Sequence, residues 1–155
     1  MKTYSLYRTQ LLPVTVQTAW DFFSSPNNLA KITPGDMSFV IVSKDADKPI
    51  FQGMLIEYRV KPLLGIVMKW VTEIGKVIPQ QQFTDTQLKG PYALWQHTHT
   101  FEAAPGGVLM TDEVIYALPF GIIGQIAHAI LVKSKLKSIF DFREIAIKKY
   151  FDSKK

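Results

Sequence analysis

Hydrophobic and polar residues alternate along much of the chain between residues 38 and 116. Residues 66–77 are the clearest case, because apolar Trp70 and Ile74 oppose charged Lys69 and Glu73. Successive side chains of a strand point to opposite faces of a sheet, so this alternation predicts a half-buried antiparallel strand. Similar patterns predict further strands at residues 3–12, 38–43, 51–60, 80–88, 95–101 and 110–116.

Helical spacing appears in two places. Val16, Trp20 and Phe23 form one apolar stripe, which predicts a short helix that ends before Ser24-Ser25-Pro26. Residues 27–32 predict a second short helix. Residues 121–152 predict one long helix, and we expect its apolar side to comprise Ile122, Ile126, Ile130, Leu136, Phe140 and Ile147.

The order of these elements predicts an α+β domain of the helix-grip kind. Consecutive strands with short connections favour a curved antiparallel sheet of about seven strands. One face of such a sheet must be covered, and the C-terminal helix is the element large enough to cover it. We also expect a cavity between them, because one helix does not fill the whole concave face of a curved sheet.

Length and composition narrow the class of protein. A chain of 155 residues suits one domain, residues 1–155. It has no cysteine, which excludes disulfides, thiolate catalysis and cysteine-based metal sites and is compatible with the expected cytoplasmic location. Residues 1–8 contain no apolar stretch before the charges resume, so we do not expect a signal peptide there. Residues 114–132 are apolar, but Pro119, Gly121 and Gln125 argue against a transmembrane segment.

The net charge of +5 is modest, and much of it lies late in the chain. Acidic Asp141, Glu144 and Asp152 interrupt the basic residues, and no aromatic residues are interleaved as in single-strand-binding proteins. We therefore expect a solvated helix face and no nucleic-acid partner, and the alternative is an interaction module that uses this basic face for an anionic partner. The basic residues in question are Lys133, Lys135, Lys137, Arg143, Lys148, Lys149, Lys154 and Lys155.

Candidate chemistry concentrates on two neighbouring strands. His97 and His99 share one strand face with Trp95 and Phe101. The next predicted strand presents Asp112 and Tyr116 on one face, and the preceding one presents Asp85 and Gln87. Opposed side chains in an antiparallel pair lie about 4.5–5.5 Å apart at Cβ, so a carboxylate could orient an imidazole and raise its pKa.

Three interpretations of this group remain open. The histidines and aspartates could form a structural hydrogen-bond network that fixes strand register. They could orient a ligand at one end of an apolar cavity. They could also serve a metal or acid–base catalysis, although the sequence shows no third strong metal ligand. The candidate ligand-binding residues are His97, His99, Asp112, Trp95, Asp85, Gln87, Trp70 and Tyr116, and His128 is expected to be structural.

Several segments, in order, resemble the START/Bet v 1-like (SRPBCC) superfamily, and in particular a bacterial branch of ligand-binding SRPBCC proteins. They are WDFFSSPNNL at residues 20–29, ITP at 32–34, DTQLKGPY at 85–92, WQHTHTF at 95–101, DEVIY at 112–116 and PFG at 119–121. The resemblance covers essentially the whole chain. It implies a sheet that grips the C-terminal helix around an internal cavity.

Members of this superfamily bind lipids, hormones, polyketides and other apolar molecules, and some are cyclases, aromatase subunits or hydrolase-like enzymes. The fold does not fix the function. The resemblance thus implies a protein that binds a small hydrophobic or amphipathic molecule, with a cavity enzyme using a histidine–carboxylate pair as the alternative. We expect no cofactor, no bound metal, and a monomer or weak homodimer.

Overall fold

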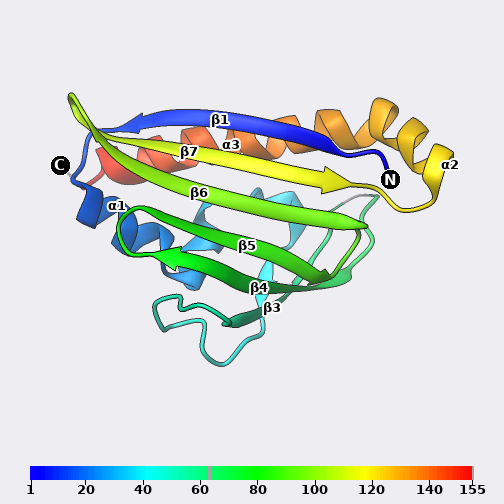
Figure 1. Ribbon diagram of the computed structural model, residues 1–155, viewed down its shortest axis with the longest axis horizontal. Coiled ribbons are helices and arrows are strands. Elements are labelled where there is room, and N and C mark those ends of the chain that lie inside the picture. Colours follow the sequence, from blue (N-terminus) through cyan, green and yellow to red (C-terminus); the bar gives the residue numbers. More distant parts are fainter. Residues whose placement is uncertain (63, 155) are drawn as a thin grey trace.

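The computed structural model of the chain describes residues 1–62 and 64–154. Seven antiparallel strands form one sheet in the order β1-β7-β6-β5-β4-β3-β2 (Figure 1). This confirms the predicted α+β helix-grip class. The strands are β1 (Tyr4–Leu12), β2 (Val40–Ile41), β3 (Leu55–Val60), β4 (Met68–Ile78), β5 (Gln82–Lys89), β6 (Leu94–Ala104) and β7 (Gly107–Ala117).

The helices lie at the ends of the sheet and behind it (Figure 1). Thr15 caps the first of them, because its hydroxyl accepts a hydrogen bond from the Thr18 amide at 3.1 Å. The long C-terminal helix α3 runs across one face of the sheet. The helices are α1 (Val16–Phe23), the 3₁₀ helices η1 (Pro26–Ile32) and η2 (Gly35–Met37), α2 (Gly121–Ala127), the π-helical turn η3 (His128–Val132) and α3 (Lys133–Asp152).

Two predicted strands are shorter than expected. The strand predicted at residues 38–43 is reduced to β2, because Ser38 ends η2 in a left-handed conformation with φ of 47°. The strand predicted at 51–60 begins only at Leu55. The preceding residues form a turn in which the Met54 amide donates to the Phe51 carbonyl at 3.0 Å and Gly53 adopts φ of 87°.

The inward face of the C-terminal helix differs from the prediction in its first half. Ile122, Ile126 and Ile130 are exposed, at 75%, 55% and 68% of their surface. The buried residues are instead Gly124, His128 and Val132, followed by Leu136 and Phe140. A spacing of four residues drifts around an α-helix, and the wider π turn at residues 128–132 counteracts this drift.

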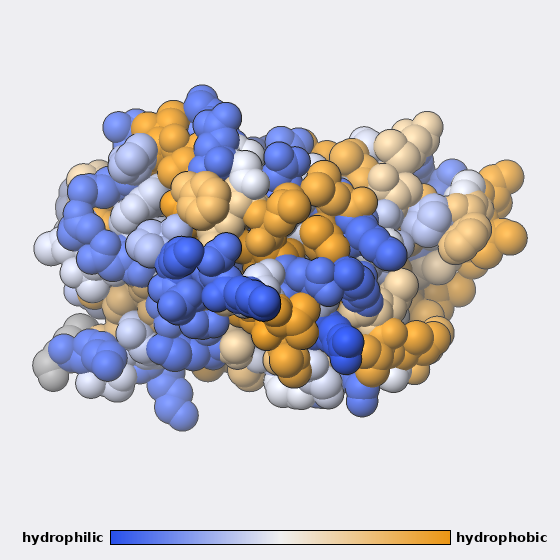
Figure 2. Space-filling model, turned by 90° about the horizontal axis from the view of Figure 1, so that it is seen from below, coloured by the Kyte–Doolittle hydropathy of each residue, from blue (hydrophilic) through white to orange (hydrophobic). Residues whose placement is uncertain are grey.

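Exposed apolar side chains gather at the end of the molecule that carries α2. Phe120 and Ile123 are exposed at 80% and 73%, beside the three isoleucines above. Figure 2 shows this end as a largely apolar surface. Within the described part of the chain, none of the helices has the combination of length and hydropathy that a membrane span requires.

The core has two main parts along the length of α3. Near the C-terminus, Phe22 of α1 and Phe151 of α3 pack with Phe83 and Phe101 of the sheet. Nearer the start of α3, Leu136 and Phe140 pack with Trp70 and other aromatics. The predicted α1 stripe is partly correct, since Trp20 and Phe23 pack against this core but Ala19 and Phe22 are the fully buried residues.

Candidate ligand-binding site

A cavity of about 180 Å³ lies between the sheet and α3. Its walls come from three layers of the fold: Leu29 and Ile32 from η1, Trp70 and Trp95 from the sheet, and Leu136 from α3. Most of the lining is apolar. A polar cluster borders it, which we define as Asp85, His97, His99, Asp112 and Arg143.

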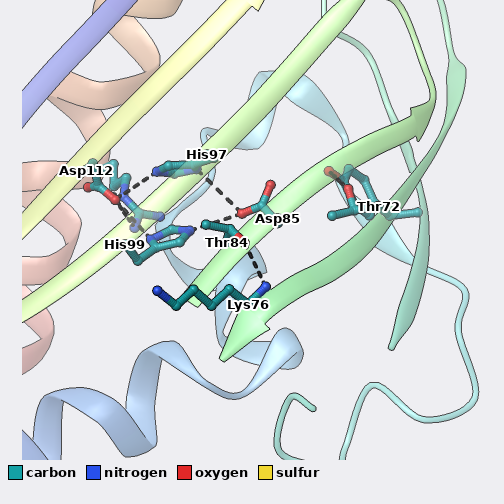
Figure 3. Close-up of polar contacts among 9 residues, drawn as sticks. Thr72, Lys76, Thr84, Asp85, His97, His99 and Asp112 are labelled. Atoms are coloured by element: carbon teal, nitrogen blue, oxygen red, sulfur yellow. Dashed lines mark hydrogen bonds and ion pairs between the residues drawn. The ribbon is translucent and has the colours of Figure 1, made fainter. Parts of the chain in front are cut away.

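Strand register places the four sheet residues of the polar cluster. Asp85 on β5 lies opposite His97 on β6, and His99 lies opposite Asp112 on β7. The alternation of β6 therefore puts both histidines on the buried face, where their ring centroids are 3.8 Å apart. Figure 3 shows the two aspartates on opposite sides of the histidine pair.

Each aspartate contacts both histidines. His97 Nε2 lies 2.9 Å from Asp112 Oδ1, and His99 Nε2 lies 3.1 Å from Asp85 Oδ2. The other ring nitrogens complete the pattern: His97 Nδ1 is 3.7 Å from Asp85 Oδ2, and His99 Nδ1 is 3.0 Å from Asp112 Oδ1. The last contact lies at ion-pair distance but not at the angle of a hydrogen bond.

Arg143 closes the polar cluster from the helix side. Its Nε donates to Asp112 Oδ2 and its Nη2 donates to Asp112 Oδ1, both at 3.2 Å. The guanidinium also lies over the rings of Phe23 and Phe140, at 5.5 and 6.0 Å. Arg143 is 6% exposed, so its assignment to a solvated helix face was wrong.

Burial and neighbouring charges have opposite effects on the pKa values of Asp112 and Asp85. Burial alone would raise the pKa of Asp112, but the Arg143 charge, the hydrogen bond from His97 and the close contact with His99 hold it well below its usual value. Burial likewise raises the pKa of Asp85, and the His99 hydrogen bond and the histidine charges outweigh it, so the net shift is downward. Both acids are carboxylates at neutral pH.

The two histidines respond differently to the same surroundings. Burial lowers the pKa of His97, and the charge of His99 lowers it further, so the net shift is downward. Burial also lowers the pKa of His99, but its close contact with the Asp112 carboxylate and its hydrogen bond to Asp85 outweigh burial and raise the pKa. His99 is therefore the first of the pair to gain a proton as the pH falls.

Trp70 in the apolar wall of the cavity combines aromatic packing with an unpaired polar atom. It packs edge-to-face on Trp95 at 5.4 Å and lies 5.7 Å from the ring of Tyr58. Its Nε1 is buried, with no hydrogen-bond partner among residues 1–62 and 64–154. An unpaired buried donor is costly, because burial removes the water that it would otherwise bind.

The structure brings five of the eight predicted site residues to the cavity wall. These are Asp85, His97, His99, Trp70 and Trp95. The other three lie elsewhere: Asp112 lies behind the histidines, Gln87 bonds the backbone of Tyr92 through both amide atoms, and Tyr116 bonds His128.

His128 lies in the π-helical turn η3, where it contacts tyrosines of β1 and β7. Its Nε2 lies 2.8 Å from the Tyr116 hydroxyl, and its ring stacks on Tyr4 at 3.5 Å between centroids. Because burial and the charges of Lys133 and Lys2 lower its pKa, the neutral ring is favoured in this hydrogen bond with the Tyr116 hydroxyl.

Sequence reasoning missed Arg143 as a site residue, although a signal was present. Leu136, Phe140, Arg143 and Ile147 follow one another at spacings of four, three and four residues. Such a spacing keeps all four on one helix face, so an arginine within an apolar stripe predicts a buried charge that needs a buried acid. Asp112 is that acid.

Solved structures of similar architecture are found at low sequence identity. Ara h 8.0201 is 14% identical, with a TM-score of 0.68 over 98% of this chain and 99% of that chain. The major latex-like protein 151 from Panax ginseng is 12% identical, with a TM-score of 0.69 over 96% and 97%. The di-domain ARO/CYC StfQ of the steffimycin biosynthetic pathway is 9% identical, with a TM-score of 0.72 over 98% of this chain and 51% of that chain.

These likenesses concern architecture. No protein-family model matches the sequence, and no curated protein matches it. The three structures superpose on 96–98% of this chain. The chain therefore has the helix-grip fold, which it shares with these solved structures.

Proposed function

We propose that this protein binds a small, largely apolar molecule that carries a hydrogen-bond acceptor, in the cavity between the sheet and α3. The observation that carries the proposal is the buried, unpaired Nε1 of Trp70 in a wall that is otherwise mostly apolar. A ligand acceptor that met this donor, once the indole had turned toward the cavity, would relieve the cost of its burial. Burial of the apolar part of the ligand would supply affinity, at about 25 cal/mol per Å².

The cavity volume favours a compact ligand. An apolar cavity of about 150 Å³ holds a benzene molecule. The volume here is about 180 Å³. A ligand of one ring with a short polar substituent matches this space better than a long-chain lipid. The polar cluster lies on the same wall and would orient the substituent through His97, His99 and, indirectly, Asp112.

A titration with acetophenone tests this proposal, because acetophenone combines one ring with one carbonyl acceptor. In ¹H–¹⁵N spectra, we expect the indole resonance of Trp70 to move as acetophenone is added. Trp20 lies outside the cavity lining, so its indole resonance serves as the internal control. A Trp70 resonance that stays in place at millimolar acetophenone, or moves no more than that of Trp20, would contradict the proposal.

A second candidate is a cavity enzyme of the cyclase or hydrolase kind. The observation in its favour is that His97 and His99 lie side by side with pKa values shifted in opposite directions, as suits an acid–base pair. One structural neighbour is an ARO/CYC protein, which is compatible with such chemistry. To test it, each compound found to bind in the cavity is incubated with the protein and then analysed by mass spectrometry. Conversion by the wild type and not by His99→Gln supports the enzyme. No conversion by the wild type contradicts it.

A further inference from the structure

Three potential metal ligands converge on one part of the cavity wall. Asp85, His97 and His99 each offer one ligand atom, and these three atoms lie within 4.8 Å of one another. The ring nitrogens that face Asp85 are His97 Nδ1 and His99 Nε2. Asp85 Oδ2 is 3.7 Å from the first nitrogen and 3.1 Å from the second (Figure 3). All three residues line the cavity.

The spacing of these atoms suits a common metal ion. Nitrogen and oxygen ligands bind zinc at about 2.0–2.2 Å, which places neighbouring ligands of a tetrahedral site roughly 3.4 Å apart. The two observed distances from Asp85 lie on either side of this value.

The second carboxylate, Asp112, lies where a residue that supports the metal-binding histidines would be expected, not where it would bind the metal itself. Histidines that bind a metal usually donate their other ring N–H to a carboxylate, which fixes the ring orientation. Here the ring nitrogens directed away from Asp85 are His97 Nε2 and His99 Nδ1, and they lie 2.9 and 3.0 Å from Asp112 Oδ1. Asp112 thus holds the His97 ring through a hydrogen bond and lies at ion-pair distance from His99 Nδ1, without hydrogen-bond geometry.

Arg143 separates the roles of the two aspartates. It engages both oxygens of Asp112, which leaves that carboxylate committed to the guanidinium and to the outer faces of the histidines. Asp85 has no arginine or lysine partner among the ion pairs of the described residues. Asp85 is therefore the carboxylate free to bind a cation directly.

We propose that Asp85, His97 and His99 bind one divalent transition-metal ion, zinc(II) or iron(II), at the wall of the cavity. Two imidazoles and one carboxylate suit both ions and leave further coordination positions for water or for an atom of a cavity ligand. The sequence showed no third ligand, and the register of β5 against β6 supplies it. This inference goes beyond the proposed ligand binding and does not depend on it.

The test is a metal titration of the full chain after dialysis against a chelator, with no organic ligand present. Cobalt(II) is followed by its visible absorption and zinc(II) by calorimetry. We expect one equivalent of either ion, complete loss of this binding in Asp85→Asn and His99→Gln, and unchanged binding in His128→Gln. Asp112→Asn is expected to weaken binding by about 10–100-fold, as loss of an outer partner does.

A measurement on the wild type covers the case in which a variant fails to fold. In ¹⁵N spectra of the imidazole rings, zinc(II) should shift His97 Nδ1 and His99 Nε2 and leave His128 in place. The proposal is overturned if the wild type binds less than about one-tenth of an equivalent, if Asp85→Asn binds as well as the wild type, or if His128 is the ring that responds. If the protein binds acetophenone but no metal, the proposed function stands and the metal site is wrong. If it binds the metal but no acetophenone, only the proposed function is wrong.

Discussion

Arg143 on α3 and Asp112 on β7 form a buried ion pair with two hydrogen bonds, each of 3.2 Å. Asp112 also contacts both histidines of the polar cluster. The pair therefore joins the long helix to the sheet and, through one carboxylate, holds the orientation of His97 and His99. This single connection couples the stability of the fold to the geometry of the cavity wall.

Removal of Arg143 should destabilise the protein strongly. In Arg143→Met the buried Asp112 carboxylate loses its compensating charge, and such a change typically costs about 3–5 kcal/mol. Urea denaturation measures the loss. The double variant Arg143→Met/Asp112→Asn should recover part of it, because no uncompensated charge remains. Arg8→Met, which removes a partly exposed partner of Asp141, should cost about 1 kcal/mol or less. Equal costs for Arg143→Met and Arg8→Met would contradict this assignment.

His128 should make folding stability depend on pH. Its pKa is lowered in the folded protein by burial and by the charges of Lys133 and Lys2. As the pH falls below about 6.5, the unfolded chain takes up a proton that the folded protein resists, so stability decreases. Between pH 7.5 and 5.5 the wild type should lose more unfolding free energy than His128→Gln. An equal or larger loss in the variant would show that His128 does not titrate in this way.

Extra volume at Ile139 should block the cavity. Ile139 of α3 lines it, and the added ring in Ile139→Phe would take up part of about 180 Å³. We expect acetophenone affinity to fall at least tenfold, as measured by calorimetry. Ile145→Phe is the matched control, because Ile145 lies on the same helix, is 69% exposed and does not line the cavity. Similar affinities in both variants would place the ligand outside the cavity.

Gly124 should not tolerate a side chain. A Cβ at this position would lie 2.1 Å from the Pro119 carbonyl oxygen, which belongs to the backbone and has no rotamer to yield. Gly124→Ala should therefore lower the free energy of unfolding by about 1–3 kcal/mol. Gly35→Ala, where a Cβ meets nothing within 4 Å, should change it by much less. A neutral Gly124→Ala would show that α2 can shift freely against the preceding loop.

Strand alternation predicted the sheet and the histidine pair well, because a period of two fixes which residues share a face. It failed at residues 51–54, where a local turn closed by the Met54 amide and the Phe51 carbonyl replaces the start of the predicted strand. The inward face of the C-terminal helical segment was harder to predict. Ile122 and Ile126 have the same spacing as Gly124 and His128, and periodicity does not say which set faces the sheet. The close approach of the backbone at Gly124 decides it, and that contact is tertiary.

The candidate site was predictable only in part for a similar reason. The pairing of His97 with Asp85 and of His99 with Asp112 depends on register, which the short 104–107 turn makes easy to anticipate for β6 and β7. The buried Arg143 depends on which helix face meets the sheet. Gln87 and Tyr116 share the parity of cavity residues, yet they bond the backbone of Tyr92 and the ring of His128.

The most direct test of the central proposal compares two compounds of nearly the same shape. Acetophenone carries a carbonyl oxygen where α-methylstyrene carries a CH₂ group, so the pair isolates the hydrogen bond to Trp70. We predict that the wild type binds acetophenone about 5–10-fold more tightly, as one net hydrogen bond of about 1 kcal/mol implies. Trp70→Phe should lose this preference while it still binds both compounds. Binding of neither compound to the wild type, or an unchanged preference in Trp70→Phe, would contradict the account.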